Sequence, residues 1–252
     1  MINIILNGCN GKMGRVVTRI ASESNDCKIV AGFDISDEIK NEYPVYSNPY
    51  DFNSSADVII DFSHPDSLKK LLPFAISRKL PLVIATTGLS HQQVLMLHET
   101  ANHVPVFFSA NMSLGVNLLI DLVTRAAKIL EDSFDIEIIE KHHNQKIDSP
   151  SGTALAIADA ISASLSQTKE YVYDRHSVRK KRGKNEIGIH AVRGGTIVGE
   201  HSVIFAGNDE IIEIKHCAMS KEIFAVGAIK AAKYIVGKDA GMYTMKDLVN
   251  NI

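Results

Sequence analysis

The first half of the chain alternates short, β-branched apolar runs with longer amphipathic segments. The apolar runs predict strands at 2–6, 28–33, 58–61, 82–85 and 104–108. Helical patterns follow Gly11, Pro65 and Ser90, and we expect Ser63 and Ser90 to cap two of these helices. Strands that alternate with helices are typical of βαβ units, so we predict an α/β, Rossmann-like domain with a parallel sheet.

The pattern changes near Asn111. A turn-like stretch leads into a long amphipathic run at 118–130 and a strand at 134–140. Glycine-rich turns then separate strand-like runs at 187–192, 196–205 and 211–215, which we predict to be antiparallel neighbours. An alanine-rich helix at 220–236 is expected to pack back on the first domain. We therefore predict a dinucleotide-binding domain at 1–113 and 224–252, and a smaller α+β domain for substrate binding and oligomerisation at 114–223.

Composition and charge indicate an ordinary globular protein. The 252 residues are 45% hydrophobic, and the formal net charge of −2 gives no general attraction to nucleic acid or to an anionic membrane. The three cysteines are few and far apart, so we expect a reducing, cytoplasmic location without disulfides. Because Met1 leads directly into the apolar run at 2–6, we expect no signal peptide, and no apolar stretch reaches membrane-spanning length.

A glycine-rich loop follows the first predicted strand and opens a helix. Gly8, Gly11 and Gly14 are spaced G-x-x-G-x-x-G, which lets the backbone approach a pyrophosphate at the helix N-terminus. Asp34 ends the second strand, about 20 residues further on, where an acid hydrogen-bonds the adenosine ribose. Because no Gly-Lys-Ser/Thr follows the glycines, a nucleoside triphosphate is disfavoured.

The residue after Asp34 bears on the choice of cofactor. Enzymes that prefer the phosphorylated cofactor often place an arginine near the ribose acid, but here the neighbour is Ile35. Lys12 in the glycine loop can compensate in part. We therefore expect NADH to be preferred, or both NADH and NADPH to be used.

Two further loops follow strands of the first domain, at the carboxyl ends where open α/β sheets bind ligands. Their small residues would let a nicotinamide ring lie close to the backbone. The loops read A-T-T-G at 85–88 and S-A-N-M at 109–112.

The segment at 140–153, E-K-H-H-N-Q-K-I-D-S-P-S-G-T, concentrates groups that carry protons. His142 and Lys146 stand four positions apart, so in a strand or a helix they point to the same side, while His143 faces elsewhere. A metal site is a weaker alternative, because adjacent histidines in a strand diverge and no Cys, Asp or Glu lies at a convincing ligand spacing. We expect no metal.

The same segment predicts an anion-binding helix start. Ser149 is a good N-cap and Pro150 a good first helical residue. The backbone N–H groups of Ser151, Gly152 and Thr153 would then be free to bind a carboxylate or phosphate. Proton carriers beside such a site suggest chemistry on a small acidic molecule.

A basic run lies before the last strands of the second domain. It comprises Arg175, Arg179, Lys180, Lys181, Arg182 and Lys184. No aromatic platform lies within 179–184, so we interpret the run as a mobile, solvated loop rather than a nucleic-acid patch. A minor role in attracting an acidic substrate remains open.

Taken together, these motifs resemble the 4-hydroxy-tetrahydrodipicolinate reductases, also called dihydrodipicolinate reductases, of bacterial and plant lysine synthesis. The resemblance runs essentially from end to end. Its most specific elements are G-x-x-G-x-M-G at 8–14, A-T-T-G at 85–88, S-A-N-M-S-L-G-V-N at 109–117, E-K-H-H-N-Q-K-I-D-S-P-S-G-T-A at 140–154 and V-R-G-G-x-I-V-G-E-H at 192–201.

The resemblance implies an enzyme and its site. A nicotinamide hydride goes to a cyclic imine dicarboxylate with loss of water, and the sheets of the α+β domain assemble a homotetramer. By motif, His142 resembles the catalytic proton donor and acceptor, Lys146 the proton donor, and His143 with Gly152 and Thr153 the binders of the substrate carboxylates. The residues that would contact the dinucleotide are Gly8, Cys9, Asn10, Gly11, Lys12, Met13, Asp34, Ala85, Thr86, Thr87, Ser109, Ala110, Asn111 and Met112.

Three positions depart from the family pattern. Ala85 stands where glycine is frequent, Lys221 where arginine is frequent, and Ile35 where some members carry arginine. The first change alters the packing of the nicotinamide ring slightly, and the second keeps a charge but removes bidentate geometry. None of them touches the proposed catalytic residues.

Two other functions compete with this one. The first is another nicotinamide-dependent reductase of a small carboxylic acid, which would share the cofactor domain but not the substrate. The second is a redox-sensing regulator that binds dinucleotide without turnover, although a sensor has no use for His142 and Lys146 beside an anion site. For an enzyme, we expect the two domains to close around the substrate.

Overall fold

The computed structural model describes residues 1–36 and 39–251. The chain divides into two compact units, Met1–Leu114 with Glu222–Ile252, and Gly115–Lys221. The boundaries predicted from the sequence, after 113 and after 223, differ from these by one and two residues. None of the described helices is long and apolar enough to cross a bilayer.

The first unit contains a seven-stranded sheet in the order β12-β6-β5-β4-β1-β2-β3, in which every pairing is parallel. The predicted strand at 58–61 is confirmed as it stands, and the other four differ by one residue at one end. Strands β3 and β12 were missed because two or three residues show no periodicity. The strands are β1 Ile2–Asn7, β2 Cys27–Phe33, β3 Val45–Tyr46, β4 Val58–Asp61, β5 Leu82–Ile84, β6 Pro105–Phe108 and β12 Gly241–Tyr243.

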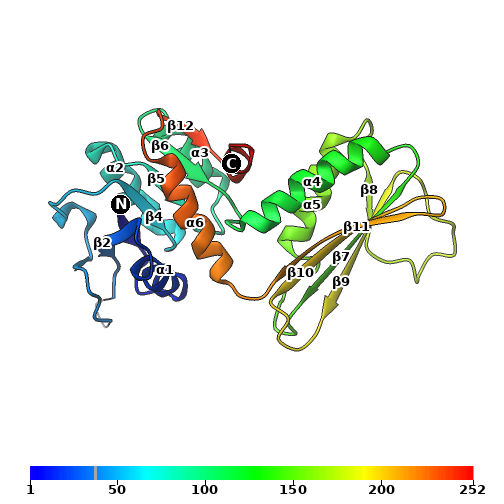
Figure 1. The fold of residues 1–252 in the computed structure, drawn as a ribbon, viewed down its shortest axis with the longest axis horizontal. Coiled ribbons are helices and arrows are strands. Elements are labelled where there is room, and N and C mark those ends of the chain that lie inside the picture. The colour runs from blue at the N-terminus through cyan, green and yellow to red at the C-terminus, as the bar shows by residue number, and fades with distance from the viewer. Residues whose placement is uncertain (37–38, 252) are drawn as a thin grey trace. The chain divides into compact units, whose positions relative to one another are not determined.

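Helices cover both faces of this sheet (Figure 1). Successive side chains of a strand point to opposite faces, so Ile4 joins one apolar core and Ile5 the other. The core around Ile4 contains residues of α1 (Lys12–Ser22), α6 (Glu222–Ile235) and α7 (Met245–Asn250), which confirms that the alanine-rich helix packs on the first domain. The core around Ile5 contains residues of α2 (Leu68–Arg78) and α3 (His91–Thr100).

One of the two expected helix caps is present. Ser90 caps α3 in a capping box with Gln93. The expectation for Ser63 is wrong, because a 3-10 turn at Pro65–Ser67 precedes α2. The Ser63 hydroxyl instead contacts Asp61 and Ser67.

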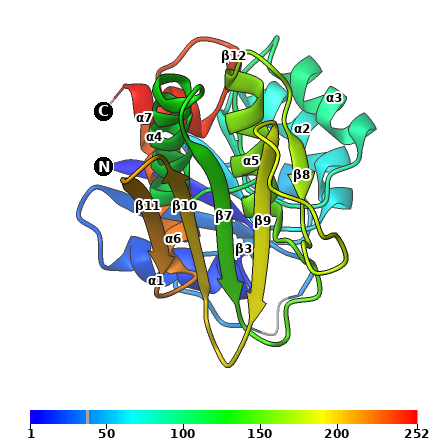
Figure 2. The ribbon, with the colours of Figure 1, turned by 90° about the vertical axis from the view of Figure 1, so that its right-hand side faces the viewer.

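The second unit contains a five-stranded mixed sheet in the order β11-β10-β7-β9-β8 (Figure 2). Helices α4 (Leu114–Leu130) and α5 (Gly152–Ser164) contribute to the apolar core of this unit, and α4 begins earlier than the predicted position 118. The strands are β7 Asp135–His142, β8 Glu170–Val172, β9 Glu186–Arg193, β10 Gly199–Ala206 and β11 Ile211–Ala218.

The predicted order of the last three strands is partly wrong. Strands β10 and β11 are antiparallel neighbours, as expected. Strands β9 and β10, however, lie on either side of β7, and β9 pairs with β7 in parallel. Adjacent strands lie about 4.8 Å apart, so a connection that crosses one strand spans about 10 Å, which the stretch at 194–198 can cover.

Strand β7 has one buried and one accessible face. Its residues alternate between half-buried and buried along the whole strand. Ile136 and Ile138 enter the core beneath the helices, and Glu140 and His142 follow them at the same two-residue period. Two polar residues therefore continue a row of core residues.

Candidate active site

The glycine loop lies between β1 and α1 in the first unit. Gly8 has φ +78°, which favours glycine, and its N–H donates to the Phe33 carbonyl at 2.8 Å. A Cβ atom on Gly14 would collide with the carbonyl oxygen of Gly8, so the backbone can pack this closely only with glycine there. The loop thereby presents the start of α1 at the carboxyl edge of the sheet.

Asp34 contacts this loop. Its carboxylate accepts hydrogen bonds from the Asn10 N–H at 2.9 Å and from the Ser36 N–H at 3.1 Å. The side chain of Asn10 in turn donates to the Ser36 carbonyl. The structure thus brings together the glycine loop and the acid that the sequence predicts for the ribose.

A cavity of about 880 Å³ adjoins these residues. Ligand pockets are typically about 300–1,000 Å³, so its size suits part of a dinucleotide. Lys69 and Lys70, which the sequence analysis missed, also line it, together with Ile35. Their sequence signal was a pair of lysines at the start of a predicted helix, which alone does not distinguish a pocket from a solvated face. The remaining lining residues include Gly8, Asn10, Gly11, Asp34, Ser63, His64 and Ser67.

Asp61, at the end of β4, was also missed. It is fully buried and accepts hydrogen bonds from the Asn7 amide and the Thr86 hydroxyl, each at 2.7 Å, and from Ser63. Burial raises the pKa of Asp61, against the effect of these neutral donors. The carboxyl group ties the ends of β1, β4 and β5 together and fixes Thr86.

The other predicted cofactor residues follow β1, β5 and β6, and two of them, Lys12 and Met13, lie in the first turn of α1. The Ser109 hydroxyl donates to the Asn111 carbonyl at 2.8 Å, and the Asn111 side chain accepts from the Ser113 N–H at 2.9 Å. Met112 and Cys9 are buried in the core, whereas Lys12, Thr87 and Ala110 are exposed and Met13 is half-buried. Ala85 is buried beside Thr86.

Cys9 keeps its proton in this environment. Burial, followed by the charge of Asp34, raises the pKa of the Cys9 thiol to about 11. A thiol with such a pKa is not a nucleophile near neutral pH. We therefore assign Cys9 to packing and to its backbone position in the loop.

His142 is the last residue of β7 and is 9% exposed. Its Nδ1 lies 2.6 Å from Glu140 Oε2. Arg193, at the end of β9, donates to both oxygens of the same carboxylate, at 2.8 and 2.6 Å. The Ser151 N–H donates to Glu140 Oε1 at 3.0 Å.

These partners keep Glu140 ionised. Burial would raise the pKa of Glu140, but the hydrogen bonds from Arg193, His142 and Ser151 outweigh it and hold the pKa below its ordinary value. The sequence contained both Glu140 and Arg193 within the motifs of the family, but their pairing across the sheet gave no local signal.

His201 on β10 completes this polar cluster and was missed. It pairs with Glu140 in the strand register, its Nε2 lies 3.1 Å from the Ser151 hydroxyl, and its ring centroid lies 5.3 Å from that of His142. Burial and then the charge of His142 lower the pKa of His201 to about 4. His201 is therefore neutral at physiological pH.

The predicted start of helix α5 is wrong. The helix begins at Gly152, and its N-cap is Ser151 rather than Ser149. The Ser151 hydroxyl accepts from the Ala154 N–H at 3.2 Å, and the buried Glu140 takes the Ser151 N–H. The Ser151 N–H is thus already bonded within the cluster. Of the next two residues, Gly152 is exposed and its N–H acts on the Asp148 carboxylate, and Thr153 is half-buried.

Lys146 does not share a strand or helix with His142, contrary to the prediction, because β7 ends at His142 and the chain then turns. The Lys146 N–H donates to the His143 carbonyl at 3.2 Å, and Lys146 Nζ pairs with Asp148 at 2.8 Å. The charge of Lys146 nevertheless contributes to the lowered pKa of His201. Lys146 therefore lies in the electrostatic neighbourhood of the cluster. His143, the residue after His142, is half-buried.

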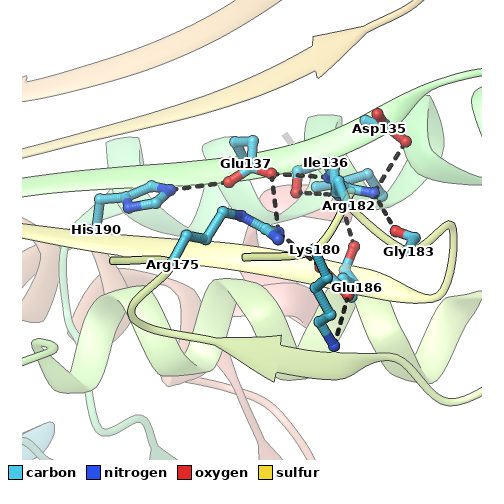
Figure 3. Close-up of polar contacts among 9 residues, drawn as sticks. All are labelled: Asp135, Ile136, Glu137, Arg175, Lys180, Arg182, Gly183, Glu186 and His190. Carbon is cyan, nitrogen blue, oxygen red and sulfur yellow. Dashed lines mark hydrogen bonds and ion pairs between the residues drawn. The ribbon is translucent and has the colours of Figure 1, made fainter. Parts of the chain in front are cut away.

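Several residues of the basic run before β9 make polar contacts with neighbouring residues (Figure 3). Arg182 donates to Glu137 and Asp135 at 2.9 Å, and to three backbone carbonyls. Arg175 pairs with Glu186 at 2.6 Å, and Lys180 lies 3.7 Å from the same residue. The interpretation as a purely solvated loop is thus wrong for Arg175 and Arg182, since neighbouring carboxylates neutralise their charge.

The described part of the chain, 1–36 and 39–251, contains no group of three or more His, Cys, Asp or Glu residues placed to hold a metal ion. What the second unit does hold is a buried carboxylate, two imidazoles and a nearby ammonium group. The ammonium group can bind an anion, and an imidazole can transfer a proton.

Comparison with known proteins agrees with the features of both units. The parallel sheet, the glycine loop and Asp34 place the chain among Rossmann-like, dinucleotide-binding proteins. Models of the dihydrodipicolinate reductase N-terminus and C-terminus match residues 2–112 and 115–249. The chain belongs to the dihydrodipicolinate reductase family.

Individual relatives cover nearly the whole chain. A protein of Caldanaerobacter subterraneus subsp. tengcongensis named 4-hydroxy-tetrahydrodipicolinate reductase is 55% identical over 99% of this chain and 98% of its own length. One of Clostridium tetani with the same name is 51% identical over 100% and 98%. Among solved structures, dipicolinate-bound dihydrodipicolinate reductase from Paenisporosarcina sp. TG-14 superposes with a TM-score of 0.82 at 22% identity, over 100% of both chains, which supports the fold.

Proposed function

We propose that this chain reduces 4-hydroxy-tetrahydrodipicolinate to tetrahydrodipicolinate with loss of water, in the diaminopimelate route of lysine biosynthesis. The observation that carries the proposal is the cluster of Glu140, His142 and Arg193 beside the start of α5. It occurs in a chain whose relatives with that name match it over nearly its full length.

The residues of the first unit fit a nicotinamide dinucleotide. The N–H groups at the start of α1 would receive the pyrophosphate, and Asp34 would bind the ribose beside the cavity of about 880 Å³. When bound, the cofactor supplies a hydride. Thr86 and the loop at 109–112 would contact the nicotinamide end.

The second unit would supply the proton. One hydride and one proton enter the substrate and one water leaves, so an acid must stand near the reacting atoms. Lys146 can donate a proton from its ammonium group, and His142 can donate or accept one at a ring nitrogen. Gly152, Thr153 and His143 would bind the substrate carboxylates. Lys146 would exchange its pairing with Asp148 for one with the substrate.

The direct test follows nicotinamide absorbance with freshly made synthase product as substrate. We expect turnover by the wild type, and for Lys146→Gln a kcat lower by about 100-fold at an unchanged affinity for the cofactor. Unchanged turnover would remove Lys146 from the mechanism. A folded wild type that binds cofactor but oxidises none would favour the sensor or a different substrate.

Three finer features belong to the same proposal. Ile35 favours NADH or dual use, and the lysines Lys69 and Lys70 in the cavity are suited to a 2′-phosphate if NADPH binds. A much higher kcat/KM with NADPH would contradict a preference for NADH. We also propose a homotetramer assembled through the five-stranded sheet, on which Ile211 is 70% exposed, and a cytoplasmic location. Light scattering would test the tetramer.

A further inference from the structure

Glu140 is surrounded by donors from three separate parts of the chain. His142 belongs to the same strand, Ser151 is the N-cap of α5, and Arg193 ends β9. The carboxylate is completely buried. A buried charge is costly unless partners satisfy it, so this arrangement fixes all of its members in one geometry.

The contact with His142 determines where the imidazole carries its proton. An ionised carboxylate accepts hydrogen bonds and donates none, so the ring must present an N–H at Nδ1. In the neutral imidazole the other nitrogen, Nε2, then carries a lone pair. A Cβ atom on Gly199 would lie 3.1 Å from Nε2, so the absence of a side chain at Gly199 leaves room on that edge of the ring.

We propose that Glu140, held by Arg193, is a positioning residue that fixes the Nδ1–H tautomer of His142 and so makes Nε2 the atom that exchanges a proton. The proposal rests on the proposed function, in which His142 handles the proton of the reduction. Glu140 itself stays ionised and does not touch the substrate.

The second buried imidazole supports this assignment. His201 lies against His142, and its Nε2 contacts the Ser151 hydroxyl. Because its pKa is lowered to about 4, His201 stays neutral while an ordinary imidazole titrates. His201 is therefore not the imidazole of this pair that carries the proton, and the role falls to His142, whose Nδ1 contacts Glu140.

The opposite face of β7 offers a matched control. Glu137 contacts His190 Nε2 at 2.8 Å and Arg182 Nε at 2.9 Å (Figure 3). The cluster thus has the same three residue types as the Glu140 cluster, and the glutamate of each cluster lies on β7. The substitution Glu137→Gln removes the same charge as Glu140→Gln, at a place to which we assign no role in catalysis.

The experiment combines turnover with nitrogen NMR of the histidines. For Glu140→Gln we expect kcat to fall by about 100-fold while the Kd of NADH stays within about twofold, and for Glu137→Gln both should stay within about twofold. In the wild type at pH 8, His142 should show the Nδ1–H tautomer. In Glu140→Gln the Nε2–H form should appear, because the side-chain amide that this substitution introduces can also donate to Nδ1.

Two results would overturn the proposal. One is an undiminished kcat in folded Glu140→Gln, and the other is an Nε2–H tautomer of His142 in the wild type. If Glu140→Gln does not fold, adding Arg193→Met removes the unpaired guanidinium, and the same two readouts apply to the double variant. The tautomer needs no turnover, so a wild type that is inactive with the substrate would refute the proposed function separately.

Discussion

Strand β7 carries two clusters of the same residue types on its two faces, and they differ in what surrounds them. Glu140 pairs with His142 and Arg193 on the buried face, and its side chain is 0% exposed. Glu137 pairs with His190 and Arg182 on the other face, and its side chain is 22% exposed (Figure 3). The residue types of a cluster alone therefore do not identify a catalytic site.

The surroundings assign the two clusters different tasks. The Glu140 carboxylate also takes the N–H of Ser151 and so connects the strand to the start of α5. The Arg182 guanidinium instead bonds the carbonyls of Ile136, Gly183 and Glu186, and so holds the basic loop against the sheet. The Glu137 carboxylate is in part accessible to water and the Glu140 carboxylate is not, so loss of the arginine partner should cost more on the buried face.

The largest difference is expected when the arginines are removed. Arg193→Ala leaves the buried carboxylate of Glu140 without its cation, and we expect a loss of about 3–5 kcal/mol in the free energy of unfolding. Arg182→Ala leaves Glu137 accessible to water and should cost about 1–2 kcal/mol. Urea unfolding measures both. Equal losses would mean that burial does not distinguish the two faces.

A second difference should appear in the dependence of stability on pH. The pKa of His201 is lowered from an ordinary 6.5 to about 4, so between these values the unfolded chain binds a proton that the folded chain does not. Stability should therefore fall as the pH drops from 6.5 to 4, by about 3 kcal/mol, and His201→Gln should remove this part of the slope. The groups that act on His201 are His142, Glu140, His216 and Lys146.

Glu140 adds a loss at lower pH. Its folded-state pKa lies below the ordinary 4.5, so its stabilising contribution is complete above that pH and disappears as the pH falls through the folded value. Chemical denaturation from pH 7 to pH 3 would resolve the two steps. A stability that stays flat down to pH 4 in the wild type would contradict a buried, neutral His201.

The smallest effects are expected from two glycines, one against each cluster. A Cβ atom on Gly199 would lie 3.1 Å from His142 Nε2, and the ring cannot yield because Glu140 holds it. Gly199→Ala should lower kcat by about tenfold. A Cβ atom on Gly188 would collide with the Glu137 carboxylate, which can move, so Gly188→Ala should cost about 1 kcal/mol of stability and leave kcat within about twofold. The reverse pattern would contradict our assignment of the two faces.

Much of the fold could be predicted because its signals are local. The alternation of β-branched runs and helices predicted the parallel sheet, and the strand Val58–Asp61 was located correctly. The relation of β9 to β10 could not be predicted, because a glycine-rich turn has the same sequence whether or not the chain crosses another strand. Ser149 and Ser151 both satisfy the rules for an N-cap, and only the folded chain shows that the Ser151 hydroxyl accepts from the Ala154 N–H.

The candidate site was predictable in part for the same reason. Gly8 and Asp34 follow a spacing that a sequence shows directly. Arg193 lies 53 positions from Glu140, and His201 lies 50 positions from Ser151, so only the folded sheet brings these pairs together. The buried Asp61 was missed because an acid at the end of an apolar run also fits an ordinary turn.

A double-mutant cycle between Glu140 and His142 tests the central claim most directly. Glu140→Gln and His142→Gln are measured for kcat singly and together. If Glu140 acts through His142, each single variant should lose about 100-fold and the double variant no more than the worse of the two, which is a coupling of about 3 kcal/mol. Losses that multiply to about 10,000-fold would show that Glu140 acts independently of His142 and would contradict the account.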